Sequence, residues 1–252
     1  MQVVVDGLLT NYSKTGAGPV VVLLHGWGDS LETFASLQKK LSGDYTVISV
    51  DLPGFGKTAA PSETFNLAKY AQFVHDFVDK IVDEPIYALI GHSNGGAISI
   101  KALVSANLAP PKLVLLASSG VRSTYKGRKK ALRIAAKAAK LPTKLMPEHI
   151  QKKLKKKAYA SIGSEMFVAE HLQQTFKEVV GEDLLASTNK VQADTLLLYG
   201  SKDTATLPAF GELFADKIQQ SELHIIEGAD HFLHHTHAPK VESLIAEFLE
   251  RK

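Results

Sequence analysis

The sequence predicts an α/β fold in which a mostly parallel sheet is flanked by helices. Short apolar runs of strand length alternate along the chain with longer segments of helical period. These runs are apolar at nearly every position, as expected of strands that are buried on both faces. A chain of 252 residues, 45% of them hydrophobic, can bury a large core. We therefore expect one α/β domain that carries an insertion.

The first element is predicted to be an antiparallel hairpin. Residues 2–5 and 8–12 flank Asp6-Gly7, a dipeptide that suits a two-residue turn because both positions tolerate positive φ. Six core strands are expected after it, at residues 20–24, 45–50, 86–90, 113–117, 195–199 and 222–226. With the hairpin they make an eight-stranded sheet.

Two helices have a clear apolar face. Between residues 67 and 82, apolar side chains recur at helical spacing, which predicts packing against the sheet. Residues 239–249 repeat the pattern. The alternation of strand and helix stops after Gly120 and resumes at Thr195. Residues 1–120 and 191–252 are therefore expected to form the core domain, and residues 121–190 a helical cap.

The predicted cap is strongly basic. Residues 122–157 hold 14 lysines and arginines and one acid, Glu148, whereas the whole chain has a net charge of +3. A helix would align six of these cations as one stripe: Lys126, Lys130, Arg133, Lys137, Lys140 and Lys144. Attraction of anionic substrates, weak contact with an anionic membrane surface and nonspecific nucleic-acid binding are the functional interpretations. A solvated face is the simpler one, and no specific nucleic-acid partner is expected.

The most informative motif is Gly91-His92-Ser93-Asn94-Gly95-Gly96, between a strand and a helix that we expect to begin at Ala97. A serine on such a sharp turn has its hydroxyl raised above the sheet. Glycine is needed two residues away on each side because a Cβ there would collide with a neighbouring element. The motif predicts that Ser93 is a nucleophile.

A serine nucleophile needs a base and an acid that orients the base. Candidates follow the last two predicted strands, with Asp203 after residues 195–199 and His231 after residues 222–226. Asp230 is an alternative acid, but the side chains of adjacent residues diverge. The predicted triad is Ser93, Asp203 and His231.

With these residues in place, the sequence resembles the α/β-hydrolase superfamily, and within it the serine-nucleophile, esterase-like members that carry a helical cap. The matching segments include His25-Gly26-Trp27-Gly28 and residues 51–56, Asp-Leu-Pro-Gly-Phe-Gly. The resemblance implies an oxyanion hole made by the backbone N–H groups of Trp27 and Asn94. It also implies that His25 and Gly26 support this loop.

The expected activity is that of a carboxylesterase acting on small to medium acyl esters, without a metal or organic cofactor. A lipase, thioesterase, carbon–carbon bond hydrolase, perhydrolase or hydroxynitrile lyase of the same fold remains open, as does a non-catalytic ligand receptor. His234, His235 and His237 follow His231, but their spacing does not specify a metal site, so we expect them to face solvent or cap a helix. Residues 54–58 lack the earlier glycine of a phosphate-binding loop.

Cysteine content and the lack of long apolar runs bear on the compartment expected for the protein. There is no cysteine, which excludes a disulfide framework and a thiolate metal site. No apolar run approaches the length of a membrane span, and residues 1–7 do not resemble a secretory leader. We expect a cytoplasmic protein that is a monomer or a dimer.

Overall fold

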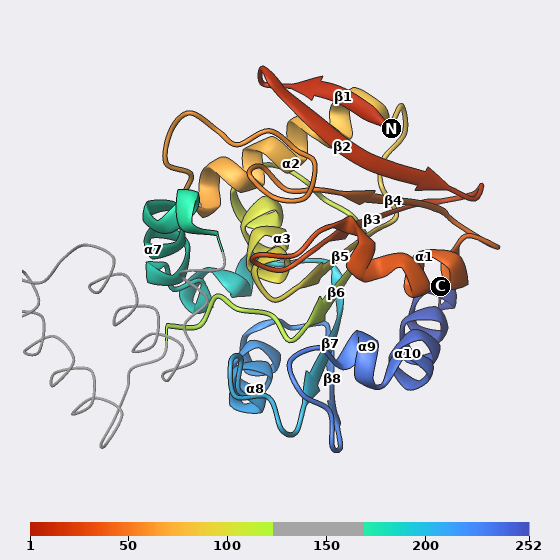
Figure 1. The fold of residues 1–252 in the computed structure, drawn as a ribbon. Helices are drawn as coiled ribbons and strands as arrows, with labels where there is room; N and C mark the ends of the chain where they lie inside the picture. The colour runs from red at the N-terminus through yellow and green to blue at the C-terminus, as the bar shows by residue number, and fades with distance from the viewer. Residues whose placement is uncertain (123–168, 252) are drawn as a thin grey trace, which may run out of the picture.

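The computed structural model describes residues 1–122 and 169–251, and its centre is an eight-stranded mixed sheet (Figure 1). The strand order is β1-β2-β4-β3-β5-β6-β7-β8. β1 and β2 are antiparallel to each other, β2 is antiparallel to β4, and the remaining pairs are parallel. The strands are β1 Gln2–Val5, β2 Leu8–Thr15, β3 Val20–Leu24, β4 Thr46–Val50, β5 Ala88–His92, β6 Lys112–Leu116, β7 Asp194–Gly200 and β8 Ser221–Ile226.

The predicted fold class and all eight strands are confirmed, with ends that shift by a few residues. The turn between β1 and β2 has positive φ at both Asp6 (47°) and Gly7 (75°), as the dipeptide predicted. β5 differs most, because it includes Gly91 and His92. The strand therefore runs directly to Ser93.

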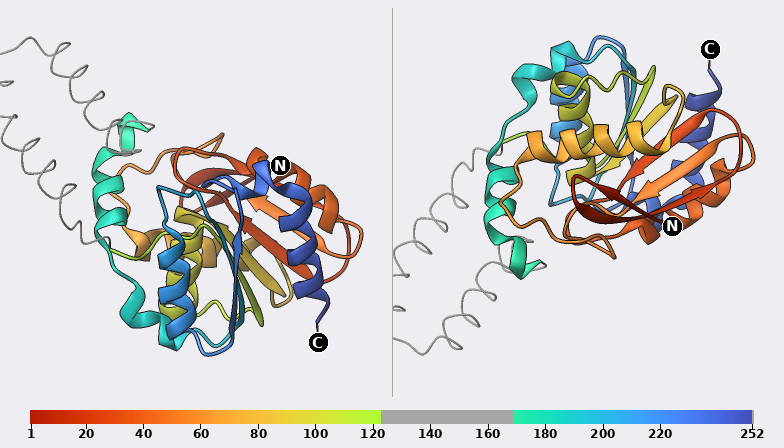
Figure 2. Two further views of the ribbon diagram at one scale, coloured as in Figure 1. Left: turned by 90° about the horizontal axis from the view of Figure 1, so that it is seen from below. Right: turned by 90° about the horizontal axis from the view of Figure 1, so that it is seen from above.

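Helices cover both faces of the sheet, because strands such as β3 are apolar on both sides. Val20, Val22 and Leu24 pack on one face, while Val21 and Leu23 pack on the other, so both sides of the strand are buried. On the first face lie α2 Leu67–Ile81, α3 Asn94–Ser105 and α8 Pro208–Lys217. α7 Gln173–Gly181, in the segment between β6 and β7, adds Val179 to the same apolar cluster. On the second lie α1 Ala35–Leu41, α9 Leu233–Thr236 and α10 Ala238–Glu250. Figure 2 shows these layers from below and above.

The local sequence accounts for some helix ends but not all. The Asn66 side chain accepts a hydrogen bond from the backbone N–H of Lys69 (2.9 Å), which caps α2 where the apolar pattern begins. The helix after Ser93 begins at Asn94, and not at Ala97 as predicted. Gly95 and Gly96 are therefore helical residues, and they bring α3 close to the sheet.

The segment predicted to form the cap lies between β6 and β7. Its described part contains the 3₁₀ helices η3 Glu170–Leu172 and η4 Leu185–Lys190, with α7 between them. An ion pair between Lys101 Nζ and Glu182 Oε1 (2.7 Å) joins this part to α3. The predicted cationic stripe, from Lys126 to Lys144, lies outside the described residues. No helix within residues 1–122 and 169–251 combines the length and hydropathy of a membrane span.

Candidate active site

Ser93 lies on a strained turn between β5 and α3. Its φ is 51° and its ψ is −112°, a conformation that a residue with a side chain rarely adopts. The turn is held at both ends, because the Ser93 N–H donates to the Leu116 carbonyl (2.9 Å) and the Ser93 carbonyl accepts from the Ser119 N–H (3.0 Å). Strand β6 and the residues after it therefore fix the position of the serine.

The glycines around Ser93 allow elements to approach that a Cβ would separate. A Cβ at Gly91 would collide with the Gly95 carbonyl, and one at Gly95 would collide with the Leu24 carbonyl at the end of β3. A Cβ at Gly96 would lie 2.7 Å from Ser118 Cβ. The steric reason for glycine at positions 91 and 95 is the one the motif predicted, and Gly96 adds a third contact.

Asp203 and His231 meet at the ends of β7 and β8. The Nδ1 atom of His231 lies 2.8 Å from Asp203 Oδ2, and their side chains are 10% and 0% exposed. The alternative acid, Asp230, instead accepts a hydrogen bond from the Phe232 N–H (3.0 Å). Because a carboxylate can only accept, Nδ1 carries the proton and Nε2 is left with a free lone pair.

The Asp203 carboxylate has further donors. Oδ1 accepts from the N–H groups of Ala205 (2.7 Å) and Thr206 (2.9 Å), and Oδ2 accepts from the Thr206 hydroxyl (2.7 Å). Burial raises the pKa of Asp203, but hydrogen bonding to His231 and Thr206 and the attraction of His231 outweigh it, so the pKa lies below its ordinary value. The acid is held ionised.

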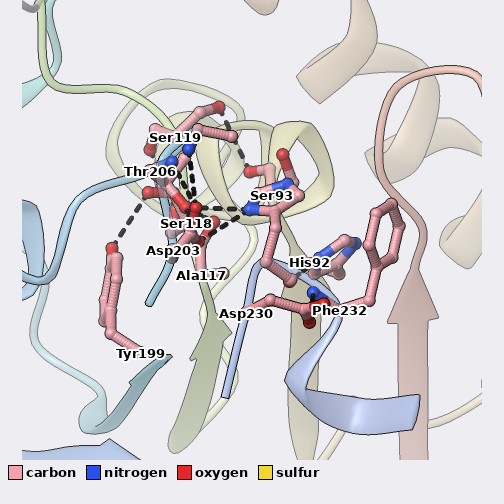
Figure 3. A network of polar contacts seen from close by, with 12 residues as sticks. His92, Ser93, Ala117, Ser118, Ser119, Tyr199, Asp203, Thr206, Asp230 and Phe232 are labelled. Carbon is pink, nitrogen blue, oxygen red and sulfur yellow. Dashed lines mark hydrogen bonds and ion pairs between the residues drawn. The ribbon is translucent and has the colours of Figure 1, made fainter. Parts of the chain in front are cut away.

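Ser93 and the Asp203–His231 pair share one edge of the sheet. β5, β6, β7 and β8 are consecutive in the sheet, and Ser93, Asp203 and His231 follow three of them. His92, which precedes Ser93, donates from Nε2 to the His231 carbonyl (3.0 Å). Figure 3 shows Asp203 and Thr206 gathered with Ser118 and Ser119 beside Ser93. Among the described residues, no hydrogen bond joins the Ser93 hydroxyl to His231, a bond that is often long in free enzymes.

This strand-end arrangement agrees with a sequence comparison. The profile of the alpha/beta hydrolase family matches residues 21–243, which is most of the chain. The chain belongs to the α/β-hydrolase family. The protein is a serine hydrolase of this family.

Three relatives illustrate the range of this family. An uncharacterized protein of Mycobacterium tuberculosis is 24% identical over 272 residues, covering 98% of this chain and 80% of its own length. The 2-hydroxy-6-oxo-6-(2'-aminophenyl)hexa-2,4-dienoic acid hydrolase of Metapseudomonas resinovorans is 31% identical over 118 residues, or 46% of this chain and 41% of the relative. The structure of an esterase from Exiguobacterium antarcticum aligns with a TM-score of 0.79 and 22% identity over 99% of both chains.

In this hydrolase, the loop after β3 packs against the turn that carries Ser93. A Cβ at Gly26 would lie 2.9 Å from His92 Nδ1 and 3.3 Å from Ser93 Cβ, so only glycine permits this approach. In the described part of the chain, the N–H groups of Trp27 and Asn94 have no hydrogen-bond acceptor. Both are therefore free to bind an oxygen near Ser93.

His25 supports the same loop from below. It is fully buried, and its Nδ1 donates to the Gly26 carbonyl (2.7 Å) while its Nε2 accepts from the Leu52 N–H (3.0 Å). Burial lowers the pKa of His25, which keeps the ring neutral and both bonds intact. These two contacts fix the His25 ring between the Gly26 carbonyl and the Leu52 N–H.

The hydrolase also leaves polar side-chain atoms unpaired near the serine. Within the described structure, Trp27 Nε1 and both amide atoms of Asn94 are buried without a hydrogen-bond partner. The Trp27 ring packs edge-on against Phe55 and Phe176, with ring centroids 4.9 and 5.1 Å away. Phe176 belongs to α7, so the segment after β6 reaches the loop that precedes the nucleophile. Nothing in the sequence singled out Phe176.

A cluster of imidazoles surrounds His231. His92 and His234 have ring centroids 4.4 Å apart, and both are buried, as is His231. The exposed Phe232 ring packs beside them. His234 is only 5% exposed, so the expectation that it faces solvent or caps a helix is wrong. Thr33 Oγ1 lies 3.0 Å from its Nε2, while its Nδ1 is buried without a hydrogen-bond partner among the described residues. In residues 1–122 and 169–251, no group of three potential ligands is arranged to hold a metal ion.

Proposed function

We propose that this hydrolase is a carboxylesterase that cleaves small to medium acyl esters with Ser93 as nucleophile, His231 as base and Asp203 as the orienting acid. The observation that carries the proposal is the buried Asp203–His231 pair at the same sheet edge as the strained Ser93 turn. The Nδ1–H tautomer set by Asp203 leaves Nε2 of His231 able to accept the serine proton.

The reaction follows from these positions. The Ser93 oxygen attacks the ester carbonyl carbon while His231 Nε2 takes the hydroxyl proton, and the negative charge on the carbonyl oxygen is stabilised by the N–H groups of Trp27 and Asn94. When the carbon–oxygen bond of the ester breaks, His231 gives the proton to the leaving alcohol. A water molecule then attacks the acyl-enzyme, again losing a proton to His231, and the acid is released with Ser93 restored. Each step uses only groups of this chain and water.

We further propose that residues 121–190 form a cap over this site. The contact of Phe176 with Trp27 supports it, as does the hydrogen bond from the Phe65 N–H to Thr175 Oγ1 (3.1 Å). The excess of cations between residues 122 and 157 favours anionic esters among the substrates. Increasing salt is then expected to lower kcat/KM for an anionic ester more than for a neutral one.

A carbon–carbon bond hydrolase is the second candidate. The partial similarity to the Metapseudomonas dienoic acid hydrolase favours it. Against it, that similarity covers only 46% of this chain. Turnover of a 2-hydroxy-6-oxohexa-2,4-dienoic acid, measured beside an ester, separates the two.

The test is turnover of p-nitrophenyl acetate and butyrate, with labelling by a fluorophosphonate. Ser93→Ala is expected to lower kcat at least about 1,000-fold and to abolish labelling. Ser105→Ala is the matched control, since this exposed serine ends the same helix. Undiminished turnover or labelling in Ser93→Ala would refute the assignment.

A further inference from the structure

We propose that Thr206 is a positioning residue for the reaction, whose hydroxyl donates to Asp203 and holds the carboxylate in register with His231. The inference rests on the proposed function and adds a group that the triad motifs do not contain. Thr206 is 4% exposed and three residues beyond Asp203. Its hydroxyl contacts Asp203 and His231, so it acts through them.

The hydroxyl oxygen of Thr206 has three polar neighbours. It lies 2.7 Å from Asp203 Oδ2, 2.9 Å from the Ala117 carbonyl and 3.1 Å from His231 Nδ1. A threonine hydroxyl has one proton, and two of these neighbours can only accept. The proton belongs to the Asp203 contact, because that distance is the shorter one and fits a hydrogen bond to a charged oxygen.

This assignment gives Asp203 Oδ2 two donors, the Thr206 hydroxyl and the His231 Nδ1–H. Oδ1 is held separately by the N–H groups of Ala205 and Thr206. With both oxygens fixed, the carboxylate cannot rotate away from the imidazole. Without the Thr206 hydroxyl, the buried Oδ2 would keep only one donor. The ionised form of Asp203 would then be less stable.

A structural role in the turn after Asp203 does not explain the hydroxyl. The turn is already closed by the backbone N–H of Thr206, which donates to Oδ1 (2.9 Å) and is present whatever the side chain. The hydroxyl oxygen also lies close to groups from other strands. It is near the Ala117 carbonyl at the end of β6 and near His231 Nδ1 after β8.

The backbone of Ala117 is held in a position that brings its carbonyl to Thr206. It has a φ of 45°, unusual for a residue with a side chain, and its N–H donates to the Leu198 carbonyl (2.8 Å) in β7. The strained turn directs the Ala117 carbonyl toward Thr206. Groups from three neighbouring strand ends therefore meet around one hydroxyl oxygen, beside the atoms that must stay aligned during proton transfer.

The experiment compares Thr206→Val, which keeps the shape and removes the hydroxyl, with Thr206→Ser, which keeps the hydroxyl. Thr204→Val is the matched control, because Thr204 is exposed in the same loop. For p-nitrophenyl butyrate we expect Thr206→Val to lower kcat roughly 10- to 100-fold with KM nearly unchanged. Thr206→Ser and Thr204→Val are expected to stay close to the wild type.

The pH profile distinguishes positioning from folding. Removal of the donor raises the proton affinity of the Asp203–His231 pair, so the acid limb of kcat/KM is expected to move to higher pH in Thr206→Val and to return in Thr206→Ser. If Thr206→Val does not fold, Thr206→Ala replaces it, and the comparison with Thr206→Ser still isolates the hydroxyl.

The outcomes separate this inference from the function on which it rests. A wild-type protein without Ser93-dependent esterase activity would refute the proposed function, and this inference with it. An active wild type with an unchanged rate and acid limb in Thr206→Val would refute the role of Thr206 alone. A loss in Thr206→Ser as large as in Thr206→Val would also refute it, since the hydroxyl would then not be the cause.

Discussion

Acid is expected to destabilise this fold through its buried histidines, and His234 gives the clearest test. Its ring lies against His235, His92 and Phe34, with centroids 4.2, 4.4 and 5.5 Å away. Burial, together with repulsion from His235 and His231, lowers the pKa of His234 from 6.5 to about 3. The folded protein therefore keeps this ring neutral at pH values where an unfolded chain would protonate it.

The size of the effect follows from that difference in pKa. Between pH 6.5 and about 3 the unfolded state binds one proton more than the folded state at this residue, so stability rises with pH and is lost as pH falls through this window. The loss is about 1.4 kcal/mol for each pH unit, or roughly 2.7 kcal/mol between pH 6.5 and 4.5. Burial also lowers the pKa values of His92 and His25, which adds losses of the same sign.

The assay is urea unfolding at a series of pH values from about 7.5 down to 4.5. We expect the free energy of unfolding of His234→Phe to fall less steeply with acid than that of the wild type, by about 1.4 kcal/mol per pH unit. Phe34→Leu is the matched control, because it disturbs the same cluster without removing a titratable group, and is expected to lower stability equally at every pH. Parallel lines for His234→Phe and the wild type would refute the reasoning.

Three further predictions concern packing around the site. Gly95→Ala would place a Cβ against the Leu24 carbonyl, so soluble yield and Tm are expected to fall sharply, whereas Gly43→Ala, in open space, is expected to behave as wild type; equal effects would contradict the steric argument. Asn94→Leu removes two buried, unpaired polar atoms and is expected to raise the free energy of unfolding by about 1 kcal/mol; a lower Tm would show that the amide is paired in solution. The Asp51 carboxylate accepts three hydrogen bonds, so Asp51→Leu is expected to cost about 3 kcal/mol or more in urea unfolding, and a loss below about 1 kcal/mol would contradict this role.

The strands were predictable because local composition decides them. A run such as Val20–Leu24 has no polar position and can only be buried on both faces, and Asp6-Gly7 encodes its own turn through its tolerance of positive φ. Helices α1 and α8 were not predicted. Both are short, with 7 and 10 residues, so that an apolar pattern extends over fewer than three turns.

The site was predictable where a motif carries a steric requirement, as around Ser93, and not where a side chain depends on distant partners. His234 packs against His92 and lies beside Thr33, which is 201 residues away in the sequence. Thr206 contacts Ala117 across 89 residues, and no local pattern marks either of them. Such pairings are set by the order of strands in the sheet, which periodicity does not determine.

That strand order also bears on how the protein folds. His92 and His231 are 139 residues apart in sequence, yet they are hydrogen-bonded, and the strands that position them are separated in the sheet by β6 and β7. Contacts of this sequence separation are slow to form because a long loop must close before they stabilise the chain. We therefore expect hydrolase activity to return after helical circular dichroism during refolding, so that turnover reports the completed sheet.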